Sequence, residues 1–363
     1  MDSALFWEMV IKSLILILVL LTGFAYLTYY ERRGLARIQS RVGPNRAGPA
    51  GLLQPVADAV KLIFKEEFIP GQAYKLVFIL APIITVVPAI LITATVPWGG
   101  IVTIGGREIM LSIADINVGV LYIMSVASIA VYGIVLGGWA SNNKYAMMGG
   151  LRSTAQMVSY ELAMGLSFVG VILLANSMRM SEIVEAQRGL WFVFLQPVGA
   201  VVFFFATLAE LNRGPFDMPE AEQELSAGFN VEYSGMKFAL FFMAEYTKRV
   251  SMSAIIATLF WGGYRGPGVD AMPGLGPLYM FIKIFLILFL MIWVRASWPR
   301  IRYDRLMDLG WKILLPLSLA LVFIAATGIL LEMMWVVPLL SIGAGAIAVH
   351  TINLSLRRKA NAR

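Results

Sequence analysis

The sequence contains no cysteine and only one histidine, His350. Iron–sulfur clusters are held by cysteine thiolates, structural zinc sites need Cys or His ligands, and a bis-histidine haem needs two imidazoles. These absences exclude such centres from the chain. Any electron transfer that the protein supports must therefore run through groups bound elsewhere.

Charged residues are also scarce. They make up 14% of the 363 residues, whereas hydrophobic residues make up 59%; an ordinary soluble domain has roughly 25% charged residues. This composition excludes a soluble globular protein. The net charge of +7 could indicate nucleic-acid binding, but the basic residues lie between long apolar runs and form no soluble domain, so no nucleic-acid partner is expected.

The apolar runs predict a single integral membrane domain over residues 1–363. Each run is near the ~20 residues that cross a bilayer as a helix. The predicted fold is all-α, a polytopic membrane helix bundle of eight or nine transmembrane helices. The ninth run is short and contains Pro338. The spans are expected at about 11–30, 76–97, 115–137, 155–176, 190–211, 237–262, 279–297, 313–331 and 335–350.

The distribution of Lys and Arg predicts the orientation of these spans. With the N-terminus outside, the cytoplasmic segments contain nineteen Lys and Arg and the outer segments four, which is the usual bias toward cytoplasmic loops. The C-terminus then lies inside if the ninth run spans. Asp2 and Glu8 stand where a cleavable signal would have basic residues, so we expect the first helix to be retained.

The first long cytoplasmic loop, 31–75, combines basic residues with tight turns. Gly-Pro pairs at 43–44 and 48–49 exclude a continuous helix. From Pro55 onward an interfacial amphipathic helix is expected, because apolar residues recur at helical spacing opposite Asp58, Lys61 and Lys65. Those apolar residues are Val56, Val60, Ile63, Phe64 and Phe68. The arginines of this loop could simply set the topology and bind anionic lipids, but the shaped loop favours a docking surface for another protein or an amphipathic ligand.

The second long cytoplasmic loop, 212–236, is acidic, which is the reverse of what topology requires. A helix starting at Pro219 would place Glu220 and Glu224 on one face, with Glu222 on another. Crowded carboxylates repel one another, so some should have raised pKa values and share protons. A solvated acidic turn is the alternative, but the segment also contains several aromatic residues. Its acids, counted from the end of the preceding span, are Glu210, Asp217, Glu220, Glu222, Glu224 and Glu232, against the single base Arg213.

Three glutamates, Glu161, Glu210 and Glu245, lie inside predicted spans. A carboxylate within the membrane costs about 2.5 to 3.5 kcal/mol or more and is a candidate functional group by default. At 1.5 Å per residue, Glu161 lies roughly 9 Å and Glu245 roughly 12 Å from the inner ends of their spans, and Glu210 lies almost at its own inner end. They could form a chain of protonatable sites beside the acidic loop. For Glu245 a structural ion pair is the alternative, since Lys248 and Arg249 follow it at i+3 and i+4.

Taken together, the motifs of this chain resemble the H subunit of bacterial NADH-quinone oxidoreductase, which is respiratory complex I. The resemblance runs over nearly the whole chain and does not rest on one motif. The matching segments are 31–33, 43–46, 51–58, 138–145, 159–161, 215–217, 219–222, 232–234, 244–246 and 302–304.

The resemblance implies a membrane subunit that is not catalytic alone and forms much of the tunnel by which a long-tailed quinone leaves the bilayer. Positions that match the family's tunnel residues are Arg32, Arg41, Asp58, Phe242 and Tyr246. Carboxylates that match its acidic funnel, which is thought to couple quinone reduction to proton pumping, are Glu161, Glu210, Asp217, Glu220, Glu222, Glu224 and Glu245.

The resemblance also implies the location, the partners and the cofactors. The chain would lie in a bacterial inner (plasma) membrane with lipids around it, bind quinone as substrate, and hold no cofactor or metal itself. Its partners would be the peripheral-arm subunits around the quinone site and the terminal iron–sulfur cluster, small membrane subunits and antiporter-like subunits. Iron–sulfur clusters and flavin are expected in those partners.

One departure from the family lies at Lys248-Arg249, where most members have uncharged residues. It bears on whether Glu245 is free to change protonation. Three other interpretations remain open at this point: a homologous subunit of a membrane-bound hydrogenase or ferredoxin-linked complex, a stand-alone proton-coupled transporter, and a scaffold that only joins two arms of a complex. The shaped loops favour the quinone-linked interpretation over the transporter.

Overall fold

The computed structural model describes residues 3–104, 106–218 and 228–361 and is almost entirely helical. Its α-helices are α1 (Ser3–Ile38), α2 (Gln54–Ile63), α3 (Lys75–Leu91), α4 (Gly119–Ala140), α5 (Lys144–Ala175), α6 (Met180–Ala186), α7 (Phe192–Leu195), α8 (Pro197–Glu210), α10 (Gly235–Phe260), α11 (Gly276–Ser297), α12 (Tyr303–Leu309), α13 (Leu315–Leu330) and α14 (Val336–Asn361). A π-helical turn at Gly310–Leu314 joins α12 to α13, and short 3₁₀ turns lie at Pro49–Gly51, Ile92–Thr95, Gly228–Asn230 and Pro273–Leu275.

The membrane bundle expected from the apolar runs is confirmed. Among the described residues, six helical segments are long and apolar enough to cross a bilayer, and the segments 197–210 and 336–352 are shorter apolar helices. The remaining predicted span, 237–262, is α10, which is 26 residues long and includes the charged residues Lys237, Glu245, Lys248 and Arg249. The protein is therefore a multi-pass membrane protein.

Several boundaries differ from the expected ones. Helix α1 continues to Ile38, so residues 31–33 belong to a helix and not to the loop. The amphipathic helix α2 ends at Ile63, so Phe64 and Phe68 lie beyond it. Span 190–211 is divided into α7 and α8 at Gln196, because Pro197 begins a new helix. A two-stranded antiparallel hairpin, β1 (Ile101–Ile104) and β2 (Arg107–Met110), also stands within the otherwise all-α fold.

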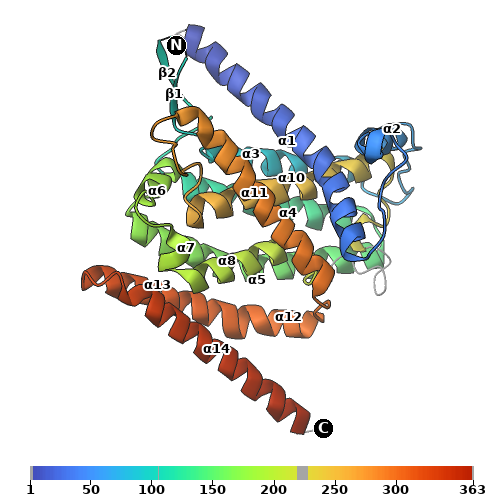
Figure 1. The fold of residues 1–363 in the computed structure, drawn as a ribbon. Coiled ribbons are helices and arrows are strands. Elements are labelled where there is room, and N and C mark those ends of the chain that lie inside the picture. The colour runs from blue at the N-terminus through green and yellow to red at the C-terminus, as the bar shows by residue number, and fades with distance from the viewer. Residues whose placement is uncertain (1–2, 105, 219–227, 362–363) are drawn as a thin grey trace.

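The segments predicted to be cytoplasmic gather at one end of the bundle (Figure 1). Helix α2 lies there beside the C-terminal end of α1, and α12 lies toward the same end. The hairpin, α6 and the N-terminal end of α1 lie toward the opposite end. Helices α13 and α14 pack side by side along one flank, where α13 contacts α5 and α14 contacts α8. Consecutive spans thus run in opposite directions between these two ends, which is consistent with the predicted topology.

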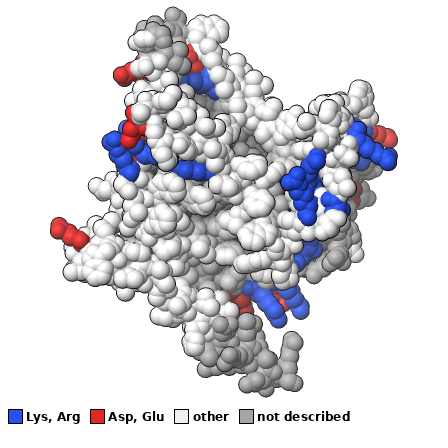
Figure 2. All heavy atoms as spheres, viewed as in Figure 1, with Lys and Arg blue, Asp and Glu red and all other residues white. Residues whose placement is uncertain are grey.

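The interior is close-packed around α5, which contacts α4, α8 and α13. Tyr160, Phe168 and Phe203 are fully buried, and the Tyr160 hydroxyl donates a hydrogen bond to the Leu306 carbonyl at 2.8 Å. Helices α3 and α4 pack closely at Gly133, where an added Cβ atom would collide with the Thr85 hydroxyl oxygen. Large apolar side chains are exposed along most of the long helices, and the face in Figure 2 is mostly uncharged, with Lys and Arg confined to groups on the α2 side and on the opposite side of the view. A lipid-facing surface has this composition.

Candidate functional site

A buried group of charged side chains lies where α1, α10 and α11 meet the segment after α8. It consists of Glu31, Arg213, Glu245, Arg249 and Arg295, and we call it the arginine–glutamate cluster. Arg249 contacts Glu31 at 2.8 Å and Glu245 at 3.0 Å through its two terminal nitrogens. The Nε atom of Arg213 lies 2.5 Å from Glu245, and Arg295 also pairs with Glu31. Three guanidinium groups thus share two carboxylates.

The cluster encloses an aromatic ring that the resemblance assigned to the tunnel. The Cζ atoms of Arg249 and Arg213 lie 3.6 and 5.2 Å from the ring centre of Tyr246. Such cation–π contacts stabilise a guanidinium charge over the face of the ring, and they are stronger where water is excluded. The ring of Phe242, one turn earlier on α10, lies 4.6 Å from the same ring. The structure therefore brings Phe242, Tyr246 and Glu245 together on one helix.

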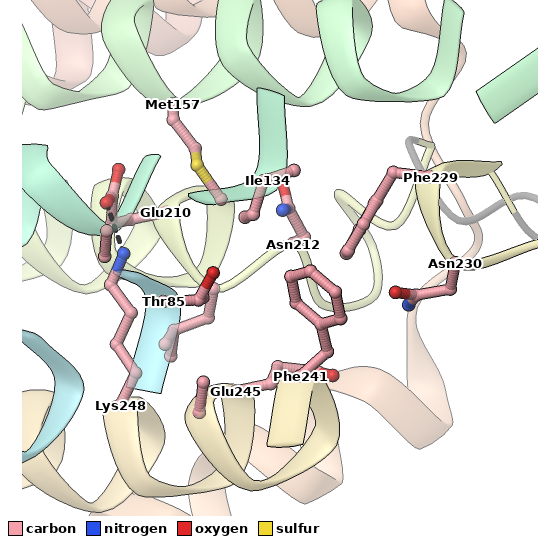
Figure 3. A pocket seen from close by; sticks show the side chains of 13 residues that line it. Thr85, Ile134, Met157, Glu210, Asn212, Phe229, Asn230, Phe241, Glu245 and Lys248 are labelled. Carbon is pink, nitrogen blue, oxygen red and sulfur yellow. Dashed lines mark hydrogen bonds and ion pairs between the residues drawn. The ribbon is translucent and has the colours of Figure 1, made fainter. Parts of the chain in front are cut away.

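A separate acid–base pair joins α10 to the end of α8. The Nζ atom of Lys248 contacts the Glu210 carboxylate at 2.6 Å, and the side chains are only 8% and 1% exposed. Figure 3 shows Lys248 reaching from α10 to Glu210 at the end of α8, across a cavity that also has Phe229 and Asn230 in its wall. The cavity has a volume of about 40 Å³ and is lined by Glu210, Glu245 and Lys248 among others. A water needs about 10 to 15 Å³ of such space, so the cavity can hold water beside both carboxylates.

Glu161 lies on α5 and has a different partner. The Ser128 hydroxyl of α4 donates a hydrogen bond to its carboxylate. Its charge is close enough to act on Glu210. Of the three glutamates predicted inside spans, Glu210 and Glu245 thus contact cations, whereas the hydrogen bond to Glu161 comes from a neutral hydroxyl.

The beginning of the acidic loop is held against α5 by a buried amide. The Gln156 side-chain nitrogen donates to the carbonyl oxygens of Ala209 and Phe216, both at 2.8 Å, and Asn212 donates to Ser153 at 2.8 Å. These bonds position the turn that leads into the loop.

Asp217 is an acid of the loop that precedes residue 219 in the sequence and is described by the structure. It pairs with Arg300 at 3.0 Å. Burial raises the pKa of the Asp217 carboxyl above its ordinary value, although Arg300 and Arg213 act in the opposite direction. The raised pKa was expected, but burial is its main cause and crowding with other acids contributes less. Glu220, Glu222 and Glu224, and the helix predicted from Pro219, lie outside the described residues.

The other predicted tunnel residues lie at the α2 end. Arg32 pairs with Asp58 at 2.6 Å, so α1 and α2 are joined by two of the predicted side chains, and Gln54 donates to the same carboxylate at 3.1 Å. Arg41 instead donates to Gln39 at 2.8 Å on the exposed turn after α1. The structure brings Arg32 and Asp58 together but places Arg41 apart from them.

Comparison with known proteins identifies the family. A family model described as NADH dehydrogenase matches residues 11–326. An H subunit of NADH-quinone oxidoreductase from Geobacter metallireducens is 48% identical over 345 residues, which cover 92% of this chain and 98% of the relative. The chain belongs to the H-subunit family of NADH-quinone oxidoreductases.

Further relatives of this family give the same result. An H subunit of the same oxidoreductase from Geobacter sulfurreducens is 52% identical over 308 residues, 85% of this chain and 92% of the relative. The H subunit from Protochlamydia amoebophila is 49% identical over 305 residues, 84% of this chain and 92% of the relative. Membership in the family makes the chain part of a multi-subunit oxidoreductase. Within the part of the chain that the structure describes, no group of three or more His, Cys, Asp or Glu side chains could hold a metal ion.

Two members of the arginine–glutamate cluster of this oxidoreductase subunit were not predicted from the sequence. Glu31 was placed at the start of the first cytoplasmic loop, and Arg295 was not among the predicted site residues. Leu27, four residues earlier on the same face of α1, is buried together with Glu31. An apolar residue at this spacing could have indicated that Glu31 lies on the inward face of a continuing helix. The ion pair considered for Glu245 does form with Arg249, whereas Lys248 turns to Glu210.

A buried cation at the opposite end was also missed, because only acids were sought within the spans. Lys283 of α11 is 5% exposed. Its Nζ atom donates to the carbonyl oxygens of Trp261, Gly263 and Arg265 at 2.5 to 2.7 Å and lies 4.6 Å from the ring centre of Trp191. This ammonium satisfies carbonyls that follow the end of α10, where the helix itself offers no donors.

Proposed function

We propose that this chain lines much of the quinone access tunnel of a proton-pumping NADH:quinone oxidoreductase and couples quinone reduction to proton translocation. One observation supports the proposal above the others. Glu245 contacts Arg213 and Arg249 beside Tyr246, and it also lines the cavity of Glu210 and Lys248. A single side chain thus joins the predicted tunnel residues to the buried acids predicted to respond to reduction.

The physical basis of the coupling is electrostatic. Reducing a quinone to a quinol consumes two protons and creates transient negative charge. Charges interact far more strongly in a poorly solvated interior than in water, so nearby carboxyl groups respond by changing protonation or position. The arginine–glutamate cluster has three cations and two acids, and this excess of positive charge favours negative charge near Tyr246.

The proposed partners follow from this role. The redox cofactors, iron–sulfur clusters and flavin, would be bound by peripheral-arm subunits that contact the α2 end, and the antiporter-like and small membrane subunits would extend the membrane arm. The membrane would be the bacterial inner membrane, with the N-terminus outside. A hydrogenase-type or ferredoxin-linked partner is the alternative for the electron path, and neighbouring hydrogenase maturation genes would favour it.

Labelling with a photoreactive quinone analogue tests the tunnel. In the assembled enzyme we expect labelled peptides to include Arg41, Phe242 or Tyr246. An excess of unmodified quinone should suppress this labelling, which separates specific sites from lipid-facing ones. Labelling confined to the α13–α14 flank would contradict the proposed tunnel lining.

Replacing Glu161 by glutamine tests the coupling. The amide keeps the shape and accepts the Ser128 hydrogen bond but cannot bind or release a proton. We expect fewer protons pumped per quinone reduced by the E161Q enzyme in proteoliposomes. Glu182→Gln is the matched control, because Glu182 is exposed at the opposite end and 3.5 Å from Arg179. An unchanged pumping ratio in E161Q would remove Glu161 from the mechanism.

A further inference from the structure

The buried ion pairs of this chain are of two chemical kinds. Arginine stays protonated at any pH that proteins experience, whereas a buried lysine loses its proton readily. In the arginine–glutamate cluster both acids contact arginines. A proton arriving at Glu31 or Glu245 would leave uncompensated guanidinium charge in a desolvated place. These two carboxylates are therefore fixed charges, although one of them was a candidate proton carrier.

The Glu210–Lys248 pair has no such restriction. If the proton on the Lys248 Nζ atom moves to the Glu210 oxygen 2.6 Å away, an ion pair becomes a neutral amine beside a neutral acid. The net charge of the pair does not change, so the transfer avoids the large cost of creating a lone charge in a low-dielectric interior. Exchange with the cavity then keeps the net charge of the pair only when one proton enters as another leaves.

The cavity beside the pair is large enough to hold water. The second carboxylate oxygen of Glu210 is buried and has no hydrogen-bond partner among the described residues. Glu210 and Lys248 both line the water-sized cavity, as Figure 3 shows. A water in that cavity could satisfy the free oxygen, as buried waters commonly do for polar groups.

Among the described residues that line the cavity, the ionisable side chain besides the pair itself is acidic. Glu245 of α10 shares the cavity, and the charge of Glu161 on α5 acts on Glu210. Thr85 of α3 and Asn212 add neutral polar groups to the cavity wall. A change in the charge of Glu161 would therefore change the electrostatic energy of the Glu210–Lys248 pair.

We infer that the Glu210–Lys248 pair is the proton-exchanging site of this chain, with Lys248 as one of its two proton-binding groups and Glu245 as a fixed charge. The inference rests on the proposed function, which requires proton exchange somewhere among the buried acids. It adds Lys248 to the exchanging groups and removes Glu245 from them.

The decisive variant is Lys248→Arg in the assembled complex. Arginine keeps the positive charge next to Glu210 but cannot release its proton. In proteoliposomes, the number of protons pumped per quinone reduced is expected to fall to near the leak level. Lys237→Arg is the matched control, because Lys237 lies on the same helix and pairs with Glu67 at the surface; its pumping ratio should equal that of the parent enzyme. A parent-like ratio in K248R would overturn the inference.

A second variant guards against a failure of K248R to assemble. The double substitution Lys248→Met and Glu210→Gln removes both charges, so it leaves no buried charge unpaired. We expect this enzyme to assemble and to pump few protons per quinone. A carboxyl signal in the infrared difference spectrum on quinone reduction can be assigned to Glu210 if it shifts with isotope-labelled glutamate and disappears in the E210Q variant. This signal should be absent from the spectrum of the double variant. Normal pumping by the double variant would show that the pair is only structural.

The outcome of E161Q separates this inference from the proposed function. If E161Q impairs pumping and the Lys248 variants do not, the coupling function stands and the assignment to Lys248 is wrong. If none of these variants changes the pumping ratio, the coupling function itself is wrong.

Discussion

Replacing Glu31 by alanine is expected to lower NADH:quinone reductase activity of membranes at least about tenfold, through loss of assembled complex. Glu31 is the acid that pairs with Arg249 and Arg295, and Arg213 lies 3.7 Å from it. Without it, Arg249 and Arg295 would each lose an ion pair. Removing one partner of a buried ion pair costs about 3 to 5 kcal/mol, and about 1.4 kcal/mol corresponds to a factor of ten.

The measurement compares activity and the amount of complex on a native gel. Glu8→Ala is the matched control, since Glu8 lies on the same helix and pairs with Lys12 at 2.6 Å with both side chains partly exposed. Such surface pairs contribute about 0 to 1 kcal/mol, so the control should assemble normally. Equal amounts of complex in E31A and E8A would show that the arginine–glutamate cluster is not needed for stability.

Replacing Lys283 by methionine should destabilise the end of the bundle opposite to α2. Methionine has a similar length, but it leaves the carbonyl oxygens of Trp261, Gly263 and Arg265 without the donor that now lies within 2.7 Å. A buried group left without its hydrogen bond costs about 1 to 3 kcal/mol. We expect the free energy of unfolding to fall by several kcal/mol, and by less where water replaces the ammonium. The apparent unfolding temperature of the purified complex should fall clearly.

Lys312→Met is the control for this substitution. Lys312 is exposed and pairs with Asp308 one turn earlier at 2.6 Å, so its loss should change the unfolding temperature little. Lys283→Arg should recover part of the stability, because a guanidinium can donate to the same carbonyls. If K283M melts at the parent temperature, the ammonium does not hold the segment that follows α10.

Hydropathy predicted the bundle because the signal is local. A helix that crosses lipid must satisfy its backbone groups internally and expose apolar side chains over about 20 residues, and each requirement is legible in a single stretch of sequence. The contact between Glu245 and Arg249 was predictable for a similar reason, since residues four apart lie on one face of a helix. The family motifs were also visible as short segments of sequence.

Other contacts depended on which helices become neighbours. Lys248 and Arg249 are adjacent in sequence, and both were candidates for Glu245, yet Lys248 pairs with Glu210 on α8. The i+3 and i+4 rule cannot separate them, because the choice depends on how α10 is rotated against α8. Boundaries were misjudged where charge and helix coincide: Glu31 looks like the start of a loop but stays inside α1, because Arg249 and Arg295 offset its charge there.

The order of residues by itself determined that this chain is a membrane helix bundle and which family it belongs to. The tertiary structure alone decided which distant group each acid contacts: Arg249 for Glu31, Arg213 for Glu245 in addition to the predicted Arg249, Lys248 for Glu210, and the Ser128 hydroxyl for Glu161. The reason is physical. Burial along a helix follows from its own side chains, whereas the charge state of a buried acid depends on groups that only the packing of distant segments brings within a few ångströms.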